Sequence, residues 1–465
     1  MSWNSVFGSL KDITEKLCEL LWGDLIKIPF FGDGYLNISI LVLILVLASL
    51  YFTFRTRFIQ FRMIPRMIKL VTKNKNAKNG FSGLHSLIVA TATRVGMGNL
   101  AGVVGALSIG GAGSVFWMWI FAMLNSSLAF AESVLAQIHK RKDETNGGTF
   151  GGPAYYIHDL FISNKSKRKK SFVALIFVFS ALLLCWSGVS QIASNSVSQS
   201  VQNAFNISPI YTSIALSLTA AFIFFKKNAD LKVLKIIVPI MSCTYFLITL
   251  FVIFKNIGSI PAVFSRILSE AFGIRQVVGG GLGTVIITGA KRGIFSNEAG
   301  SGSTPNVVAK ADFKKPQDAG LIQILSVFLD TIICTCTALL ILFLPSGYVN
   351  ELEGMSLLQS AMNYHVGAWG SIFITIELIL FSLSTFLGLM FYAEPNIIYV
   401  FGNKNKYKNL FKIFLLSMLF IGGINSFTFI WTLADLGIGL MTIFNVLALF
   451  LLSKEVVAAE SLCSL

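Results

Sequence analysis

Long apolar runs constrain the fold of this chain more than any other feature of its 465 residues. A helix needs roughly 20 mainly apolar residues to cross the hydrocarbon core of a bilayer, and eleven segments come close to that length or exceed it. Mean hydropathy is +0.73 and 13% of the residues are charged, whereas a soluble domain carries about 25%. We therefore expect an all-α integral membrane protein. Its predicted spans are residues 35–54, 84–108, 112–137, 172–204, 209–225, 235–254, 277–309, 319–345, 367–392, 409–425 and 428–453.

Basic residues are concentrated in alternate loops. The segments 55–83, 138–171, 226–235, 310–318, 393–408 and 454–465 hold 27 of the 37 Lys and Arg residues. Such an excess marks the cytoplasmic side of a membrane protein. The pattern predicts a multi-pass protein of the cell (inner) membrane with its N-terminus outside and its C-terminus in the cytoplasm. It also explains the net charge of +15 without a nucleic-acid partner.

Two of the spans contain residues that are unfavourable in an ordinary membrane helix. The second span carries Gly96, Gly98 and Gly102 beside Arg94 and Asn99. The seventh span, at residues 289–302, combines several glycines with Lys, Arg, Asn and Glu. Glycine lowers helix stability by about 1 kcal/mol, and unwound backbone at membrane depth is tolerated only around a cavity inside the protein. Both spans are therefore predicted to be broken helices that bind a ligand. Close helix packing is the alternative explanation for the glycines, but it leaves the charged residues unexplained.

The breaks lie five spans apart, in the second and seventh spans. Paired broken helices at corresponding positions are typical of transporters built from inverted repeats, with substrate and ion sites near the bilayer midplane. This spacing predicts an accessory helix within residues 1–83, together with a basic amphipathic segment. The first repeat would cover residues 84–255, the second 256–453, and a short cytoplasmic tail 454–465.

Seven segments resemble the alanine or glycine:cation symporter family. They are YFTFRTRFIQ at 51–60, RVGMGNLAG at 94–102, GGAGSVFWMW at 110–119, GGPAYY at 151–156, KRGIFSNEAG at 291–300, DTIICT at 330–335, and residues 431–445. The resemblance implies a LeuT-type fold, in which a 5+5 inverted repeat with two broken helices and one accessory helix gives eleven transmembrane helices. It also implies that sodium, or a proton, drives the uptake of alanine or glycine.

The resemblance assigns site residues as well. A sodium ion is expected between the carbonyls of Ala92 and Val95 and the hydroxyls of Ser384 and Thr385, although such hydroxyls often bond to their own helix instead. Glu298 is expected to line the ion path or brace the second break, and Arg94 with Asp435 is the predicted outer gate. The expected substrate pocket comprises Thr93, Gly96, Gly98, Asn99, Gly293, Phe295, Ser296 and Asn297, with Gln191 and Asn195 nearby.

The chain departs from the family pattern at three positions. Met97 replaces a usual hydroxyl residue, Ala193 stands where a Gln is common, and Phe444 replaces a Pro. These departures bear on the identity of the substrate, including its enantiomer, more than on the class of transporter.

The sequence thus predicts a secondary active symporter for a small neutral amino acid, with sodium as co-substrate and no other cofactor. The alternatives are a proton-coupled or sodium-coupled carrier of another small amino acid such as glutamine, and a channel. Enzyme and ATP-driven pump motifs are missing from the sequence, and the six cysteines and four histidines lack the spacing of a metal site. We expect a monomer in the lipid bilayer.

Overall fold

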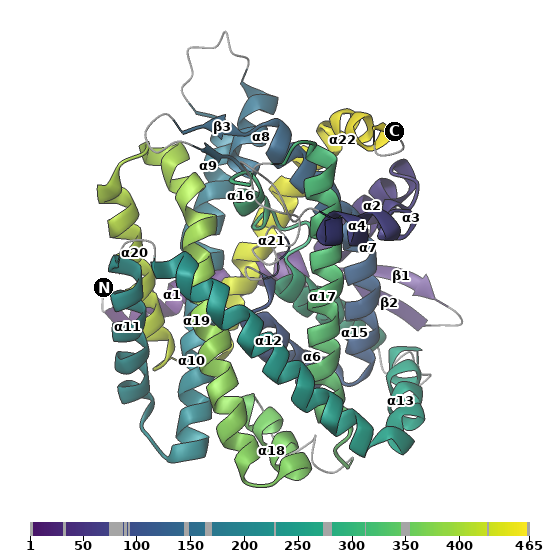
Figure 1. The fold of residues 1–465 in the computed structure, drawn as a ribbon, viewed down its shortest axis with the longest axis vertical. Coiled ribbons are helices and arrows are strands. Elements are labelled where there is room, and N and C mark those ends of the chain that lie inside the picture. The colour runs from purple at the N-terminus through teal and green to yellow at the C-terminus, as the bar shows by residue number, and fades with distance from the viewer. Residues whose placement is uncertain are drawn as a thin grey trace.

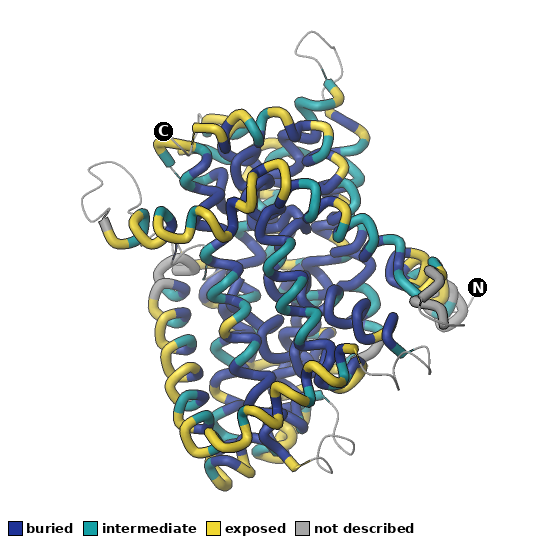
Figure 2. Tube along the Cα trace, turned by 90° about the vertical axis from the view of Figure 1, so that its right-hand side faces the viewer, coloured by how far each residue is buried: buried dark blue, intermediate teal, exposed yellow. Residues whose placement is uncertain are grey.

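The helices form a single elongated bundle, and most of them run roughly along its long axis (Figure 1). The structure is a computed structural model that describes residues 3–30, 34–73, 87, 91, 94–143, 148–162, 170–226, 229–272, 281–311, 313–345, 354–425 and 427–462. Buried residues fill the interior of the bundle, whereas exposed residues lie on its outer faces and at both ends (Figure 2).

The N-terminal part begins with a helix that the apolar runs did not predict. This helix is α1 (Trp3–Trp22). The N-terminal part continues with the antiparallel hairpin β1 (Ile26–Phe30) and β2 (Gly34–Ile38), α2 (Ile40–Arg55), α3 (Ile59–Arg62) and α4 (Ile64–Lys73). Helix α2 begins after Ser39, whose Oγ accepts a hydrogen bond of 3.1 Å from the amide of Val42. This contact satisfies one of the free amides of a helix N-terminus.

The first half of the bundle contains two π-helical segments, η1 and η2. In chain order its elements are η1 (Gly98–Gly102), α6 (Val103–Gly110), α7 (Gly113–Ile138), β3 (Arg141–Lys142), β4 (Thr149–Phe150), α8 (Pro153–Phe161), α9 (Phe172–Phe179), η2 (Ser180–Cys185), α10 (Trp186–Phe205), α11 (Pro209–Phe225) and α12 (Ala229–Lys255). Short π-helical insertions are frequent at functional sites, and η1 lies within the segment predicted to contain the first break.

The described residues of the second half form helices and no strand. Its elements are the 3₁₀ turn η3 (Ile257–Ser259), α13 (Ile260–Phe272), α15 (Gly281–Asn297), α16 (Pro305–Val308), α17 (Pro316–Leu342), α18 (Met355–Val366), α19 (Trp369–Phe401), α20 (Asn405–Gly422), α21 (Phe427–Leu451) and α22 (Ser453–Ser461). Helix α7 packs mainly against α17 and α15. It therefore lies beside the second break.

The structure has a helix within each of the eleven predicted spans, although much of 84–93 lies outside the described residues. By length and composition, six helices among the described residues could cross a membrane. They are Gly113–Ile138, Phe172–Phe205, Ile236–Lys255, Pro316–Leu342, Trp369–Phe401 and Phe429–Leu451, and three shorter apolar helices are Ile40–Arg55, Gly98–Gly110 and Pro209–Phe225. The chain is thus a helical protein with several segments able to span a membrane, whereas the eleven crossings and the inverted repeat stay predictions.

Candidate functional site

The first break lies at Val95 and Gly96, where regular helix is interrupted before η1 begins. The amide of Gly96 donates to Asn99 Oδ1 at 2.8 Å, and the amide of Met97 donates to Thr385 Oγ1 on α19 at 2.9 Å. A Cβ on Gly96 would lie 2.2 Å from Thr385 Oγ1, so this close approach requires glycine. Side-chain oxygens thus accept hydrogen bonds from both of these amides.

The second break follows Asn297, the last residue of α15. Glu298, Gly300 and Gly302 have positive φ angles of 53°, 88° and 83°, so the backbone leaves the helical path and resumes it only in α16. The amide of Ala299 donates to Asn297 Oδ1 at 3.0 Å. A positive φ is unfavourable for a residue with a side chain, and Glu298 therefore needs support from its surroundings.

The two breaks are in direct contact. Arg94 Nη1 donates to the carbonyl oxygen of Asn297 at 2.6 Å. A Cβ on Gly98 would lie only 2.7 Å from Ser296 Cα, so backbone meets backbone here. Two side chains converge on Asp330 of α17: Asn99 Nδ2 donates to Oδ1 at 2.7 Å and Ser296 Oγ to Oδ2 at 3.0 Å. The structure thus brings residues of the two broken segments together around one buried carboxylate.

A small cavity adjoins this contact. Its volume is about 10 Å³, which is room for about one water molecule. Gly293, Ser296 and Asn297, three residues of the predicted substrate pocket, line this cavity, and Asp330 contributes a charged group to its wall. The other lining residues are Val115, Met118, Trp119, Ala122, Thr331 and Cys334.

Only some of the predicted sodium ligands lie at the first break in the described part of the chain. Thr385 reaches the first break, and Val95 is buried there. Ser384 instead donates its hydroxyl to the carbonyl of Phe381 in its own helix, at 2.9 Å, which is the alternative that such hydroxyls often adopt. Ala92 and Thr93 lie outside the described residues.

Gln191 and Asn195 of α10 face a different neighbour from the one predicted. Asn195 Nδ2 donates to the carbonyls of Gly422 and Asn425, at 3.1 and 3.0 Å, and Gln191 Nε2 contacts Met418 Sδ at 3.7 Å. Both amides thus join α10 to α20 and the turn that follows it. In this structure their polar contacts do not reach the two breaks.

The predicted Arg94–Asp435 pair is not formed. Asp435 of α21 instead pairs with Lys291 at 2.8 Å and with Arg292 at 3.2 Å, both on α15. Its carbonyl oxygen accepts from Trp22 Nε1 at 2.9 Å. Arg94 instead donates to the carbonyl of Asn297, at the end of α15. Arg94 and Arg292 lie on different helices, and of the two only Arg292 faces α21.

Aromatic rings pack around the Asp435 pair. The guanidinium of Arg292 lies 3.9 Å from the ring centre of Trp431, and Phe295 packs on the same indole with ring centres 4.7 Å apart. Phe295 therefore packs beside the ion pair of Asp435 with Arg292, through the indole of Trp431. Stacking on an indole suits a guanidinium that has lost contact with water.

Glu132 of α7 braces the second break, a role that was not predicted for it. Its carboxylate accepts from the amides of Gly300 and Gly302, at 3.4 and 3.2 Å, and from Asn445 Nδ2 at 2.9 Å. Asn445 in turn accepts a hydrogen bond from the hydroxyl of Tyr156. The signal in the sequence is an acidic residue inside an apolar span, which marks a functional site by default.

Glu298 lies in the second break itself. Its Oε2 accepts from Thr304 Oγ1 at 3.4 Å, and its carbonyl accepts from Ser301 Oγ at 2.7 Å. These contacts lie within the turn between α15 and α16.

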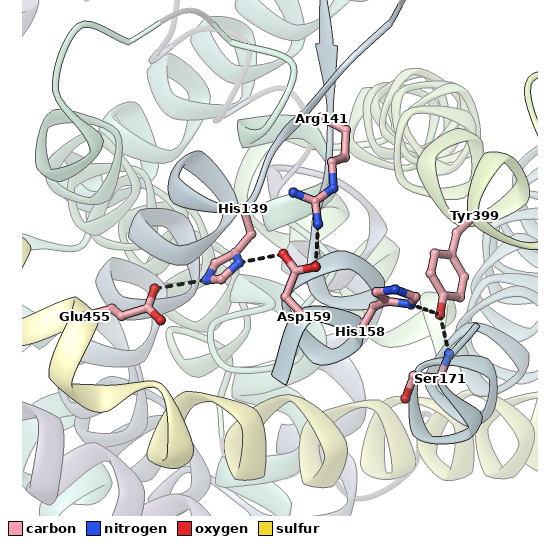
Figure 3. Close-up of polar contacts among 7 residues, drawn as sticks. All are labelled: His139, Arg141, His158, Asp159, Ser171, Tyr399 and Glu455. Carbon is pink, nitrogen blue, oxygen red and sulfur yellow. Dashed lines mark hydrogen bonds and ion pairs between the residues drawn. The ribbon is translucent and has the colours of Figure 1, made fainter. Parts of the chain in front are cut away.

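A polar cluster ties α7, α8 and α22 together beyond the spans (Figure 3). His139 contacts Asp159 at 2.8 Å and Glu455 at 3.0 Å, and Arg141 also pairs with Asp159. Burial alone would lower the pKa of His139, but the hydrogen bonds and charges of the two carboxylates outweigh it and raise the pKa. Burial would raise the pKa of Asp159, yet His139 and Arg141 lower it. Each partner thus favours the charged form of the other.

Comparisons with known proteins agree with this picture. A model described as the sodium:alanine symporter family matches residues 28–462. The amino-acid carrier protein AlsT of Bacillus subtilis (strain 168) is 38% identical over 88% of the chain and 86% of its own length. From the same organism, the probable sodium/glutamine symporter GlnT is 39% identical over 90% and 87%. The putative sodium/proton-dependent alanine carrier protein YrbD is 38% identical over 88% and 86%. The chain therefore belongs to the sodium:alanine symporter family.

Proposed function

We propose that this protein couples the entry of sodium to the uptake of a small neutral amino acid, alanine or glycine in the first place, by alternating access. It acts as a carrier rather than as an enzyme. The observation that carries the proposal is the meeting of the two breaks around Asp330. Unwound backbone and a buried carboxylate at one point provide the carbonyl and carboxylate oxygens that hard cations prefer.

The charges near the breaks favour a cation as co-substrate. Glu132, Glu298 and Asp330 are enclosed in the bundle, and the guanidinium of Arg94 acts electrostatically on all three. Three carboxyl groups around one arginine leave an excess of acid, and uncompensated charge is costly inside a membrane protein. A sodium ion, or a proton, at Asp330 would offset that excess.

The size of the site favours a small substrate. Gly96 and Gly98 let the first break approach Thr385 and Ser296 more closely than any larger residue would allow. The amides after the first break lie at the N-terminal end of the helical stretch Gly98–Gly110, which suits the carboxylate of an amino acid. Because one relative is named as a glutamine symporter and another as sodium/proton-dependent, glutamine as substrate and protons as coupling ion are the second candidates.

The arrangement in the membrane is part of the same proposal. We infer eleven spans in a LeuT-type 5+5 inverted repeat with one accessory helix, in the cell (inner) membrane. The N-terminus lies outside, the C-terminus in the cytoplasm, and the unit is a monomer. Arg292 and Asp435, rather than Arg94 and Asp435, form the outer gate. The concentration of basic residues in alternate loops and the direct contact between the two breaks support this arrangement.

Uptake by the purified protein in proteoliposomes tests the proposal. With an inward sodium gradient, we expect accumulation of labelled alanine or glycine that the unlabelled amino acid competes away. D-alanine and glutamine serve as competitors, and a pH gradient without sodium tests proton coupling. Failure to accumulate any of these amino acids under either gradient would overturn the proposed function.

A matched pair of variants localises the coupling step. Asp330→Asn is expected to abolish accumulation driven by sodium, because it removes the charge between the two breaks. Glu377→Gln removes another buried carboxyl group. Its Oε1 accepts a hydrogen bond of 2.6 Å from Thr244 of α12, which belongs to neither break. We expect Glu377→Gln to retain uptake. Equal losses in both variants would mean that any buried acid matters and that Asp330 has no special role.

A further inference from the structure

A deep apolar groove lies on the outside of the bundle, and none of its lining residues belongs to the two breaks. It is formed by α9 and η2, the last turns of α19 and the first turns of α20, and has a volume of about 710 Å³. Its walls are apolar and include Phe172, Leu183, Val400, Tyr407 and Leu410. Several of these side chains are strongly exposed, for example Phe172 (75%) and Leu410 (61%). In a bilayer such a surface faces lipid.

The groove is about as long as one leaflet is thick. From Phe172 to Leu183 the wall runs along twelve helical residues, or about 16 Å, whereas half of the hydrocarbon core measures about 15 Å. A groove of this length and apolar character fits one acyl chain of a phospholipid.

One end of the groove is fixed by polar contacts. The hydroxyl of Tyr399, near the end of α19, accepts from the amide of Ser171 at 3.0 Å and contacts His158 at 2.9 Å (Figure 3). Lys170 donates to the carbonyl of Val400. These bonds join the start of α9 to the end of α19, so this end of the groove is preformed.

The same end is basic. Lys404 and Lys406 flank the start of α20, next to the lining residue Tyr407, and both are exposed. Neither forms an ion pair among the described residues, whereas the nearby Glu394 is already paired with Lys310 and Lys408. Two uncompensated lysines at the mouth of an apolar groove complement an anionic head group on an acyl chain.

We propose that this groove binds an anionic phospholipid. One acyl chain lies between α9, α19 and α20, and the phosphate of the head group lies at Lys404 and Lys406, with Lys170 beside them. The two parts depend on each other, because exposed lysines alone or an apolar groove alone would not select this class of lipid. Basic clusters at the cytoplasmic membrane surface attract anionic lipids in general.

Binding to the full-length protein in detergent provides the test. Retained lipid is measured by native mass spectrometry, and thermal unfolding is followed as phosphatidylglycerol or phosphatidylcholine with identical acyl chains is added. We expect tighter retention and a higher unfolding temperature with phosphatidylglycerol. Equal effects of the two lipids would overturn the head-group site. The same stabilisation by inorganic phosphate would show a free-anion site instead.

Variants separate the two parts of the site. Lys404→Ala with Lys406→Ala should weaken phosphatidylglycerol binding by about 30-fold. Lys314→Ala with Lys315→Ala changes a matched pair of exposed lysines before the N-terminus of α17 and should leave it unchanged. Equal losses in both pairs would mean that only the overall charge of the surface matters and would overturn the site.

A second pair of variants tests the groove itself. Leu183→Trp fills the groove and should reduce retention of both lipids, whereas Leu218→Trp on the exposed face of α11 (66% exposed) should not. If Leu183→Trp left lipid retention intact, the acyl chain would lie elsewhere. If it instead dissociated a dimer of the protein, the groove would be an interface between two copies, and the proposal would fail.

Discussion

The two breaks differ in what holds them open. At the first break, the amides of Gly96 and Met97 bond to Asn99 and Thr385, one hydrogen bond each. At the second break, the carboxylate of Glu132 accepts hydrogen bonds from the amides of Gly300 and Gly302 and from Asn445 Nδ2. Asn445 in turn accepts one from the hydroxyl of Tyr156. The second break is therefore fixed by residues from α7, α8 and α21. At the first break each of the two amides bonds to one side chain, Thr385 of α19 or Asn99, and Asn99 in turn donates to Asp330 of α17.

This difference suggests different roles for the two breaks: the second keeps a fixed shape, and the first binds. A buried network in which every member is bonded resists rearrangement, so the second break can hold its shape throughout a transport cycle. In the proposed function, the first break, with one side-chain acceptor for each of its two amides, is the part that responds to an ion at Thr385 or to a substrate at Gly98. Variants that affect one break and spare the other test this difference.

The largest effect is expected from Glu132→Ala at the second break. It removes the acceptor of three buried donors, and a buried donor without a partner costs about 1–3 kcal/mol. We expect a markedly lower unfolding temperature in detergent and no uptake in proteoliposomes. Glu132→Gln, which keeps one acceptor oxygen, should retain part of both. A stable and active alanine variant would show that the second break is held in another way.

Gly98→Ala is expected to stop transport while sparing the fold more than Glu132→Ala does. Its Cβ would lie 2.7 Å from Ser296 Cα, so the two breaks would have to separate. Gly102→Ala is the matched control, because the nearest atoms to its Cβ are 3.8 Å away. Uptake should fall at least tenfold in the first variant and change little in the second. Comparable uptake in the two variants would contradict a tight contact between the breaks.

Thr385→Val tests whether the first break senses sodium. The variant keeps the shape of the side chain but loses the oxygen that accepts from Met97, a bond worth about 1 kcal/mol. We expect the sodium concentration for half-maximal uptake to rise about fivefold to tenfold, with Thr385→Ser close to the unmodified protein. Ser384→Ala should have the smaller effect, since its hydroxyl bonds within α19. The reverse order would reassign the sodium ligand to Ser384.

The smallest effect concerns the outermost support of the second break. Helix α8 carries Tyr156, and the His139–Asp159 contact holds α8 to the end of α7. Because the pKa of His139 is raised, its stabilising contribution is complete below about pH 6.5 and is lost as the pH rises through the raised pKa. The unfolding temperature should fall slightly over that interval. His139→Gln should remove this pH dependence, and an unchanged profile in the variant would exclude His139 as its cause.

Much of the architecture could be predicted from the sequence because its signals are local. Apolar runs identify the helices, and glycines mixed with charged residues at 94–102 and 289–302 identify both breaks. Helix α1 could not be found in this way, because its apolar residues alternate with charged ones and form no long run.

Partners across the bundle could not be predicted. Asp435 pairs with Arg292 rather than with Arg94 because the rotation of each helix about its axis, which spacing does not reveal, decides which side chain faces α21. The contact of Glu132 with Gly300 and Gly302 joins residues about 170 positions apart. Likewise, only the packing of α10 against α20 shows where Gln191 and Asn195 point.

The attachment of α1 to the Asp435 pair gives the protein an optical reporter of its own. The indole of Trp22 donates to the Asp435 carbonyl and lies 5.7 Å from Lys291, and the indole of Trp431 lies under Arg292. Nearby cations and hydrogen bonds change the emission of an indole. In a variant that keeps these two of the seven tryptophans, a shift in fluorescence would report the parting of α15 from α21 without any attached dye.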